Sequence, residues 1–167
     1  PDPLEETARL PDGRSYLLLD TGGFDPEGRE PIPAAVQEKA AEAIRRAGLV
    51  LLVTDASAGV LPGDRDAARL ARESGRATVV VANKVDRREG SEGENEAWEL
   101  GFPEVYGVSA EHGIGIDELQ DAIASRLAAM APREETAEEA AQGRREIALA
   151  IVGRPNAGKS TLINALL

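Results

Sequence analysis

Residues 147–160 read IALAIVGRPNAGKS, and this stretch decides the fold. Its first six residues are apolar, which predicts a strand buried on both faces of a sheet. The stretch from Gly153 to Ser160 fits the pattern G-x-x-x-x-G-K-S/T, and Lys159 opens a helical pattern that continues to Leu166. A strand, a glycine-containing loop and a helix in this order indicate a phosphate-binding loop. The glycines let backbone N–H groups surround an anion at the N-terminus of the helix.

The residues of such a loop have separate expected roles. Lys159 is expected to reach the β- and γ-phosphates of a nucleotide, and the hydroxyl of Ser160 is expected to ligate Mg²⁺. The alternative is a chance glycine-rich turn, which the flanking strand and helix disfavour. The other candidate phosphate-binding residues of this stretch are Gly153, Asn156, Ala157, Gly158 and Thr161.

The remainder of the chain alternates between apolar strand patterns and helical patterns. Residues 11–13 (Pro-Asp-Gly) form a turn signal, which joins the first two strands as a hairpin. The alternation predicts an α/β protein of the phosphate-loop nucleoside triphosphatase fold, with a doubly wound, mostly parallel sheet and an antiparallel edge hairpin. We expect strands at residues 5–10, 15–20, 49–54, 77–82, 104–108 and 147–152, and helices at 34–47, 64–74, 94–100, 116–129 and from 159 onward.

A second motif, Asn83-Lys84-Val85-Asp86, follows directly on the strand pattern of residues 77–82. The Asp86 carboxylate can accept hydrogen bonds from both N1–H and the 2-amino group of guanine, a pair of donors that adenine lacks. Asn83 is expected to tie this loop to the phosphate loop, and the stem of Lys84 to cover the base. Alone, the tetrapeptide could also be an ordinary polar loop. Ser109 and Ala110 end another strand pattern, where a backbone N–H could contact the guanine oxygen.

A third motif, Asp20-Thr21-Gly22-Gly23, ends the strand pattern of residues 15–20. Asp20 at this place can hold Mg²⁺ through a water molecule, and the backbone N–H of Gly23 can contact the γ-phosphate. Loss of that phosphate would release the Gly- and Pro-rich segment that follows, which gives a switch. The alternative is a strand-end aspartate in an ordinary turn.

Composition limits the possible functions. The chain has 167 residues, and 19 Lys and Arg against 30 Asp and Glu give a net charge of −11. This acidity disfavours direct binding to nucleic acid or to an anionic membrane. The absence of cysteine excludes disulfides and thiol catalysis. The apolar runs are too short to span a bilayer, so we expect a cytoplasmic protein.

The histidine and the large aromatic side chains outside the motifs are not expected to take part in catalysis. His112, the only histidine, lies in a glycine-containing loop with no cysteine or second histidine in the chain, which favours a solvated loop residue over a catalytic one. Trp98 and Tyr106 are interpreted as core or packing residues.

Residues 131–146 contain no large apolar side chain and many Glu and Arg, which indicates a solvated linker. The chain starts at Pro1, its one methionine is Met130, and it stops at Leu167 within a helical pattern. We therefore expect a part of a longer protein.

The ordered motifs resemble those of the Der family, also called EngA. The residues that carry the resemblance are DTGG (20–23), LVLLVTDASAGVLPGD (49–64), VVVANKVD (79–86), VSAEHGIGIDEL (108–119) and GRPNAGKSTLINAL (153–166). The resemblance implies two GTPase domains in tandem and a small RNA-binding domain, acting in assembly of the large ribosomal subunit. It implies a switch protein that binds GTP and GDP with Mg²⁺ and hydrolyses GTP. The alternatives are a nucleotide-binding interaction module without hydrolysis, and an ATPase or kinase of another phosphate-loop family.

The resemblance also implies a division of the chain. Residues 1–132 correspond to a first GTPase domain without its own phosphate loop and first switch, residues 133–146 to an acidic linker, and residues 147–167 to the first strand, phosphate loop and first helix of a second GTPase domain. Phe24 stands where many GTPases have a water-orienting glutamine. Asn156 matches an asparagine that helps bind potassium in related K⁺-stimulated GTPases.

Residues 1–132 alone would leave an open place in the middle of such a sheet, with unpaired backbone groups on both sides. Residues 147–152 are a strand of the kind that belongs there. We hypothesise that the chain closes on itself as a circularly permuted domain. The alternatives are a C-terminal segment that stays undocked, and an exchange of this segment between two chains. Pairing of residues 147–152 with the strands at 15–20 and 49–54 is the decisive observation.

Overall fold

The computed structural model describes residues 4–22, 34–87, 90–130, 146–154 and 156–167. The described residues form a six-stranded sheet with the strand order β1-β2-β6-β3-β4-β5. β1 runs antiparallel to β2, and the other neighbours are parallel. The predicted α/β sheet with an antiparallel edge hairpin is thus confirmed. The strands are β1 (Leu4–Arg9), β2 (Ser15–Asp20), β3 (Leu49–Asp55), β4 (Ala77–Asn83), β5 (Val105–Val108) and β6 (Ala148–Val152).

β6 is late in the sequence and central in the sheet. Leu18 of β2 is in register with Leu149, and Val50 of β3 is in register with Ala150. Residues 149–152 are buried. The pairing expected for residues 147–152 with both neighbouring strands is therefore present, and the backbone groups on the facing edges of β2 and β3 have partners within the chain.

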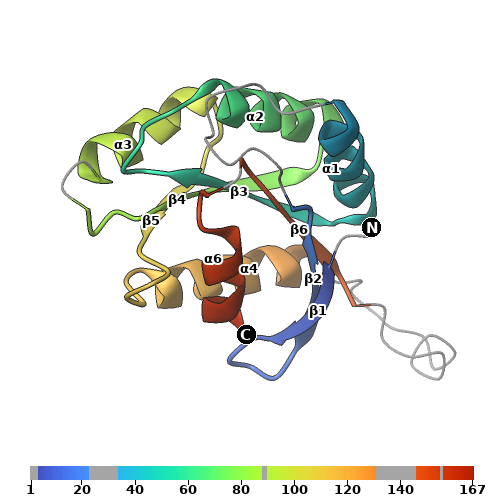
Figure 1. Cartoon of the computed structure of the whole chain (residues 1–167). Helices are drawn as coiled ribbons and strands as arrows, with labels where there is room; N and C mark the ends of the chain where they lie inside the picture. The colour runs from blue at the N-terminus through green and yellow to red at the C-terminus, as the bar shows by residue number, and fades with distance from the viewer. Residues whose placement is uncertain (1–3, 23–33, 88–89, 131–145, 155) are drawn as a thin grey trace, which may run out of the picture.

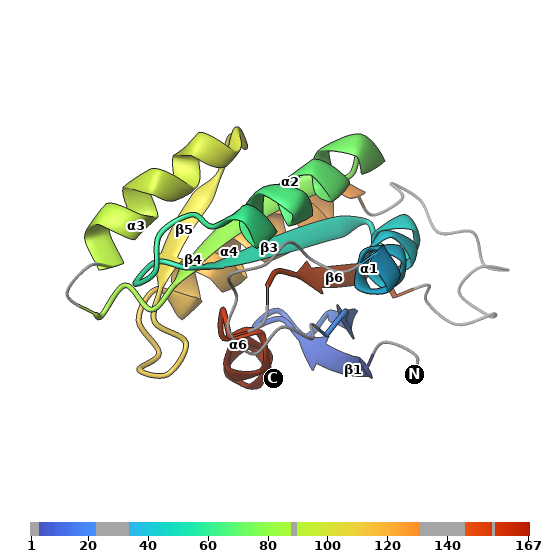
Figure 2. The same cartoon turned by 45° about the horizontal axis from the view of Figure 1, so that its top comes forward.

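Helices cover both faces of the sheet, which gives three layers (Figures 1 and 2). One face is covered by α1, α2 and α3, and the opposite face by α4 and α6. The bounds are α1 (Ala34–Arg46), α2 (Pro62–Ser74), α3 (Gly90–Ala97), α4 (Ile116–Met130) and α6 (Lys159–Leu166), and a 3₁₀ turn at Trp98–Leu100 continues α3.

The apolar strands divide their side chains between two hydrophobic clusters of the described residues. Leu51 of β3 and Ile151 of β6 belong to the cluster under α4 and α6. Leu52 and Val152, the next residues along, belong to the cluster under α1 and α2. Because successive side chains of a strand point to opposite faces, a strand buried on both faces has to be apolar throughout. This explains the continuous apolar runs of the sequence.

The helices differ from the prediction mainly at their starts. α2 begins at Pro62, two residues before the expected Asp64, because proline fits the first position of a helix and the Asp64 carboxylate accepts the Leu61 N–H at 2.8 Å. α3 begins at Gly90 rather than near residue 94. Trp98 is not a core residue, because it is 49% exposed.

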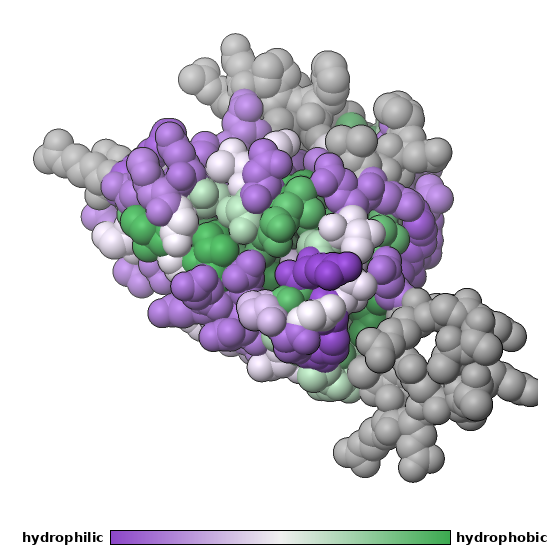
Figure 3. All heavy atoms as spheres, turned by 90° about the horizontal axis from the view of Figure 1, so that it is seen from below, coloured by the Kyte–Doolittle hydropathy of each residue, from purple (hydrophilic) through white to green (hydrophobic). Residues whose placement is uncertain are grey.

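The surface is mixed in character. On the side formed by α4, α6 and the β1–β2 hairpin, hydrophilic side chains surround apolar ones that reach the surface (Figure 3). None of the helices in the described ranges combines the length and the apolar character needed to cross a membrane.

Truncating a β6 side chain tests its central place. Ile151→Ala should lower the free energy of unfolding by about 2–5 kcal/mol, because Ile151 is fully buried between β2, β3 and the α4–α6 layer. Urea unfolding followed by circular dichroism measures this. Leu167→Ala, at a residue that is 53% exposed, is the matched control and should change little. Equal, small effects of both substitutions would show that β6 is not part of the core.

Candidate functional site

The sequence motifs meet at one edge of the sheet. Asp20 ends β2, Asn83 ends β4, and Gly153 follows β6. Ser109 comes directly after β5. Because β2, β6, β4 and β5 are parallel, their carboxyl ends lie at the same edge, where ligands bind in open α/β sheets.

The phosphate loop packs tightly against the second motif. Gly158 precedes α6 with φ +93°, and a Cβ at this position would lie 2.2 Å from Nδ2 of Asn83. Only glycine fits both the left-handed backbone and the close approach. The loop is therefore shaped against Asn83.

Lys159 points back into the phosphate loop. Its side chain is buried, and its Nζ donates a hydrogen bond to the backbone oxygen of Gly153 at 2.6 Å. Burial lowers the pKa of the Lys159 ammonium, and the nearby Asp20 carboxylate partly offsets this shift. An anion bound in the loop would favour the charged form of this lysine.

Asp20 and Ser160 face a common cavity of about 150 Å³. Oδ1 of Asp20 accepts the backbone N–H of Gly22 at 2.9 Å, which fixes the carboxylate at the end of β2. Ser160 and Thr161 are exposed in the first turn of α6. A carboxylate and a hydroxyl are hard oxygen donors of the type that Mg²⁺ prefers, so this pair fits the ion. The full lining consists of Glu6, Leu18, Asp20, Ser160, Ile163 and Asn164.

A group of carboxylates or imidazoles that could hold a metal without further ligands is not found among the described residues. Mg²⁺ at Asp20 and Ser160 would therefore need ligands from the bound nucleotide or from water.

Asn83 joins three segments through its side-chain amide. Nδ2 donates to the backbone oxygen of Ala157 in the phosphate loop at 3.0 Å. Oδ1 accepts the backbone N–H of Lys84 at 2.9 Å and that of Ala110 at 3.0 Å. The structure thus brings together Asn83, Ala157 and Ala110, which the sequence placed in separate motifs.

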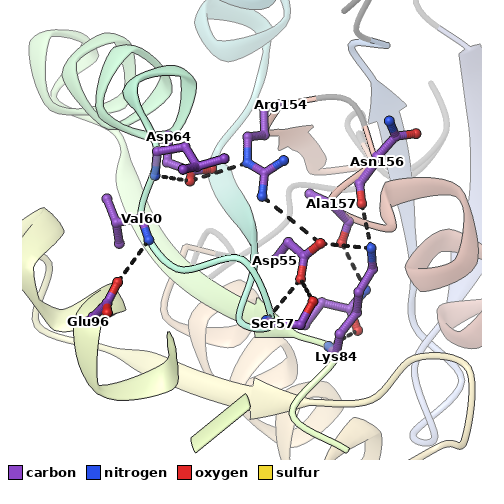
Figure 4. Close-up of polar contacts among 11 residues, drawn as sticks. Asp55, Ser57, Val60, Asp64, Lys84, Glu96, Arg154, Asn156 and Ala157 are labelled. Carbon is purple, nitrogen blue, oxygen red and sulfur yellow. Dashed lines mark hydrogen bonds and ion pairs between the residues drawn. The ribbon is translucent and has the colours of Figure 1, made fainter. Parts of the chain in front are cut away.

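Lys84 adds a second connection between the same loops. Its Nζ donates to the backbone oxygen of Asn156 at 2.6 Å and to Oδ2 of Asp55 at 2.9 Å (Figure 4). Burial by itself raises the pKa of the Asp55 carboxyl. Hydrogen bonds from Ser57 and Lys84 outweigh this effect, so that the pKa is lowered. Asp55 is therefore held as the anion that compensates the charge of Lys84.

Arg154 links the phosphate loop to the start of α2. Its guanidinium is buried, with Nε 3.4 Å from Oδ2 of the fully buried Asp64 and Nη2 4.0 Å from Oδ2 of Asp55 (Figure 4). Burial raises the pKa of Asp64, although the Leu61 N–H and the charge of Arg154 act in the opposite direction.

Arg154, Asp55 and Asp64 were missed in the sequence. Arg154 occupies a variable place of the phosphate-loop pattern, and Asp64 is an ordinary residue for the first turn of a helix. Only the contact between them, across 90 positions, shows that they act together.

The end of the site expected to bind the base is built around Asp86. A hydrogen bond from the Ser109 side chain lowers the pKa of the Asp86 carboxyl, and His112 and Arg87 nearby act in the same direction. Nε2 of His112 lies 3.2 Å from Oδ2 of Asp86. The interpretation of His112 as a merely solvated loop residue therefore omits its contact with Asp86. No sequence pattern pointed to this contact.

Some residues expected at the site lie outside the described ranges, and one lies at its surface. Gly23 and Phe24 lie outside the described residues, as does the linker of residues 133–146 except Glu146. Asn156 is described and exposed, and its side-chain amide points away from Lys84 (Figure 4).

Two family models match the chain. Residues 36–129 match the model of the "Elongation factor Tu GTP binding domain", and residues 148–167 match that of the "50S ribosome-binding GTPase". The first model covers more than half of the chain. The fold, the phosphate loop and these matches define a phosphate-loop GTP-binding domain of the translation-factor class.

Similar proteins of known name identify the family within this class of GTP-binding domains. The chain is 44% identical over 170 residues to GTPase Der of Azorhizobium caulinodans, which covers 99% of this chain and 37% of that protein. It is 41% identical over 159 residues to GTPase Der of Myxococcus xanthus, covering 93% of this chain and 34% of the relative. The chain belongs to the Der family of GTPases, and it spans little more than a third of the length of these relatives.

A solved structure shares the fold. Translation elongation factor SelB from Methanococcus maripaludis, in complex with the GTP analogue GppNHp, matches with a TM-score of 0.61. The match covers 81% of this chain and 29% of that one at 20% sequence identity. The likeness shows the arrangement of strands and helices.

Substituting Arg154 tests its buried contacts with Asp64 and Asp55. Arg154→Ala should lower the free energy of unfolding by about 3–5 kcal/mol, because it leaves the Asp64 carboxylate buried without its partner. Arg69→Ala is the control, since Arg69 pairs with Asp66 at 3.7 Å on the surface, and should cost less than about 1 kcal/mol. Thermal or urea unfolding gives both values, and an Arg154 effect no larger than that of Arg69 would contradict the network.

Proposed function

We propose that this chain binds GTP and GDP in a single site, and that the protein hydrolyses GTP as a molecular switch. One observation carries the proposal. Asn83 and Lys84 each donate a hydrogen bond to a backbone oxygen of the phosphate loop, at Ala157 and Asn156. The segment expected to recognise the base and the segment expected to hold the phosphates are therefore in direct contact.

The proposal includes the division of the chain. Residues 1–132 supply the base-binding part of a first GTPase domain, residues 133–146 act as linker, and residues 147–167 supply the strand, phosphate loop and helix that begin a second domain. The pairing of β6 with β2 and β3 supports a composite site, in which the later segment completes the earlier domain.

The phosphates would be bound by the loop and by α6. Lys159 would neutralise charge on the β- and γ-phosphates, and the backbone N–H groups of residues 156–161 would donate to phosphate oxygens. Ser160 and, through a water molecule, Asp20 would hold Mg²⁺. When bound, this ion would offset the charge that develops on the phosphate oxygens.

The base would be recognised by Asp86. Its two carboxylate oxygens would accept N1–H and the 2-amino group of guanine. The backbone N–H of Ala110 donates to Oδ1 of Asn83 at 3.0 Å, and the guanine oxygen would share this donor in a bifurcated hydrogen bond. The stem of Lys84 would cover the ring.

Hydrolysis is favoured over binding alone because the curated relatives carry the name GTPase. Asp20 and Gly23 would couple the γ-phosphate to the segment after β2, and Phe24 would leave the positioning of the attacking water to other groups. We propose a cytoplasmic protein acting in assembly of the large ribosomal subunit. The match of residues 148–167 to a 50S ribosome-binding GTPase model supports this. With a net charge of −11, this chain is not expected to contact RNA itself.

Nucleotide titration tests the proposal. The 167-residue chain should bind fluorescently labelled GDP, and labelled ADP much more weakly. Asp86→Asn should weaken GDP binding by about 100-fold, because the amide keeps one acceptor oxygen but sets an NH2 donor against the second guanine donor, and it should shift the preference toward xanthine. Asp117→Asn, at an exposed residue of α4, is the control and should bind GDP like the unchanged chain. Equal binding of GDP and ADP would refute guanine recognition.

Potassium dependence tests the role of Asn156. We propose that Asn156 helps to bind K⁺ beside the phosphates, so GTP hydrolysis should be faster in KCl than in NaCl at equal ionic strength. Asn156→Ala should remove the difference. Equal rates in the two salts for the unchanged protein would refute the potassium site.

A further inference from the structure

The loop after β5 is held in a fixed conformation beside Asp86. Ser109 and Ile114 exchange backbone hydrogen bonds at 2.9 and 3.0 Å, which closes the loop at its base. Gly115 follows with φ +73°, and a Cβ there would lie 2.5 Å from the backbone oxygen of Gly107. The loop is thus fixed to β5, and so is the residue at its tip.

His112 occupies that tip. Its backbone N–H lies 3.4 Å from Oγ of Ser109, and its Nε2 lies 3.2 Å from Oδ2 of Asp86. The His112 side chain is 54% exposed, so little packing other than this contact determines its direction. The charged neighbours are Glu111, with Oε2 4.0 Å from the same nitrogen, and Arg87 close to Asp86.

The Asp86 carboxylate therefore has two partners from one loop. The Ser109 side chain and the His112 imidazole both contact it. A carboxylate has about four lone-pair sites. These two contacts and a hydrogen bond from the backbone N–H of Asp86 itself use part of this acceptor capacity, and the paired N–H groups of a guanine base would take the remainder.

We propose that His112 is a positioning residue for guanine recognition, which holds the Asp86 carboxylate in the orientation that accepts both base donors. This inference rests on the proposed guanine site. An exposed aspartate otherwise loses side-chain freedom when it binds a base, and a prior contact reduces that loss. The imidazole does this through its Nε2–H, acting beside the Ser109 hydroxyl.

The experiment compares GDP with ADP for the 167-residue chain and three variants, by titration of labelled nucleotides at pH 7. His112→Ala should weaken GDP binding about three- to tenfold, because it removes the prior orientation of the carboxylate but no contact with the base, and should leave ADP binding unchanged. His112→Gln should restore part of the GDP affinity, because its amide is also an N–H donor. Ile114→Ala is the control: it keeps the loop's backbone hydrogen bonds, and its side chain is 50% exposed. It should match the unchanged chain.

The outcomes separate this inference from the function on which it rests. If the unchanged chain does not prefer GDP to ADP, the guanine site and this inference both fail. If it prefers GDP and His112→Ala binds GDP equally well or more tightly, the guanine site stands and His112 does not position Asp86. An equal loss for GDP and ADP would mean that His112 only supports the loop. That result would also overturn the inference.

Discussion

The pairing of β6 with both β2 and β3 is the interaction on which the rest of the structure depends. Each edge of a strand carries backbone donors and acceptors that must be paired when buried. β6 satisfies these groups on both sides of the sheet's centre, and its side chains join the two hydrophobic clusters. The same placement brings the phosphate loop, which follows β6 directly, against the end of β4. Fold and site therefore depend on one strand.

The site pairs most of its cations with carboxylates. The sequence holds three lysines, and Lys84 and Lys159 both lie in the site. Arg154 is buried beside them. Asp55 and Asp64 compensate Lys84 and Arg154, whereas Lys159 contacts a backbone oxygen and has only the more distant influence of Asp20. Of Lys84, Arg154 and Lys159, the cation without an ion pair in the described structure is therefore Lys159, the one that the motif assigns to phosphate.

Local pattern predicted most of the fold. The continuous apolar runs gave the four interior strands, and the Pro-Asp-Gly turn gave the hairpin, because burial on both faces and turn chemistry are properties of short segments. Asn83, Lys84 and Lys159 were found because their motifs have fixed spacing. Arg154–Asp64 and His112–Asp86 could not be found this way, since each joins separate segments whose approach only the folded sheet determines. Which side chains of a segment face solvent also depends on the folded sheet, so the exposure of Trp98 was missed as well.

The order of the strands has a consequence for synthesis of the chain. Among the described strands, β6 comes last in the sequence, yet it lies third in the sheet. Protein chains emerge from the ribosome N-terminus first, at about 5–20 residues per second. When these 167 residues are made by themselves, β2 and β3 lack the strand between them until residues 148–152 are released, and their facing edges can pair with strands of other molecules. At this rate, about 1–4 seconds of elongation lie between the end of α4 at Met130 and the end of β6 at Val152, and the two half-sheets stay separate for that time.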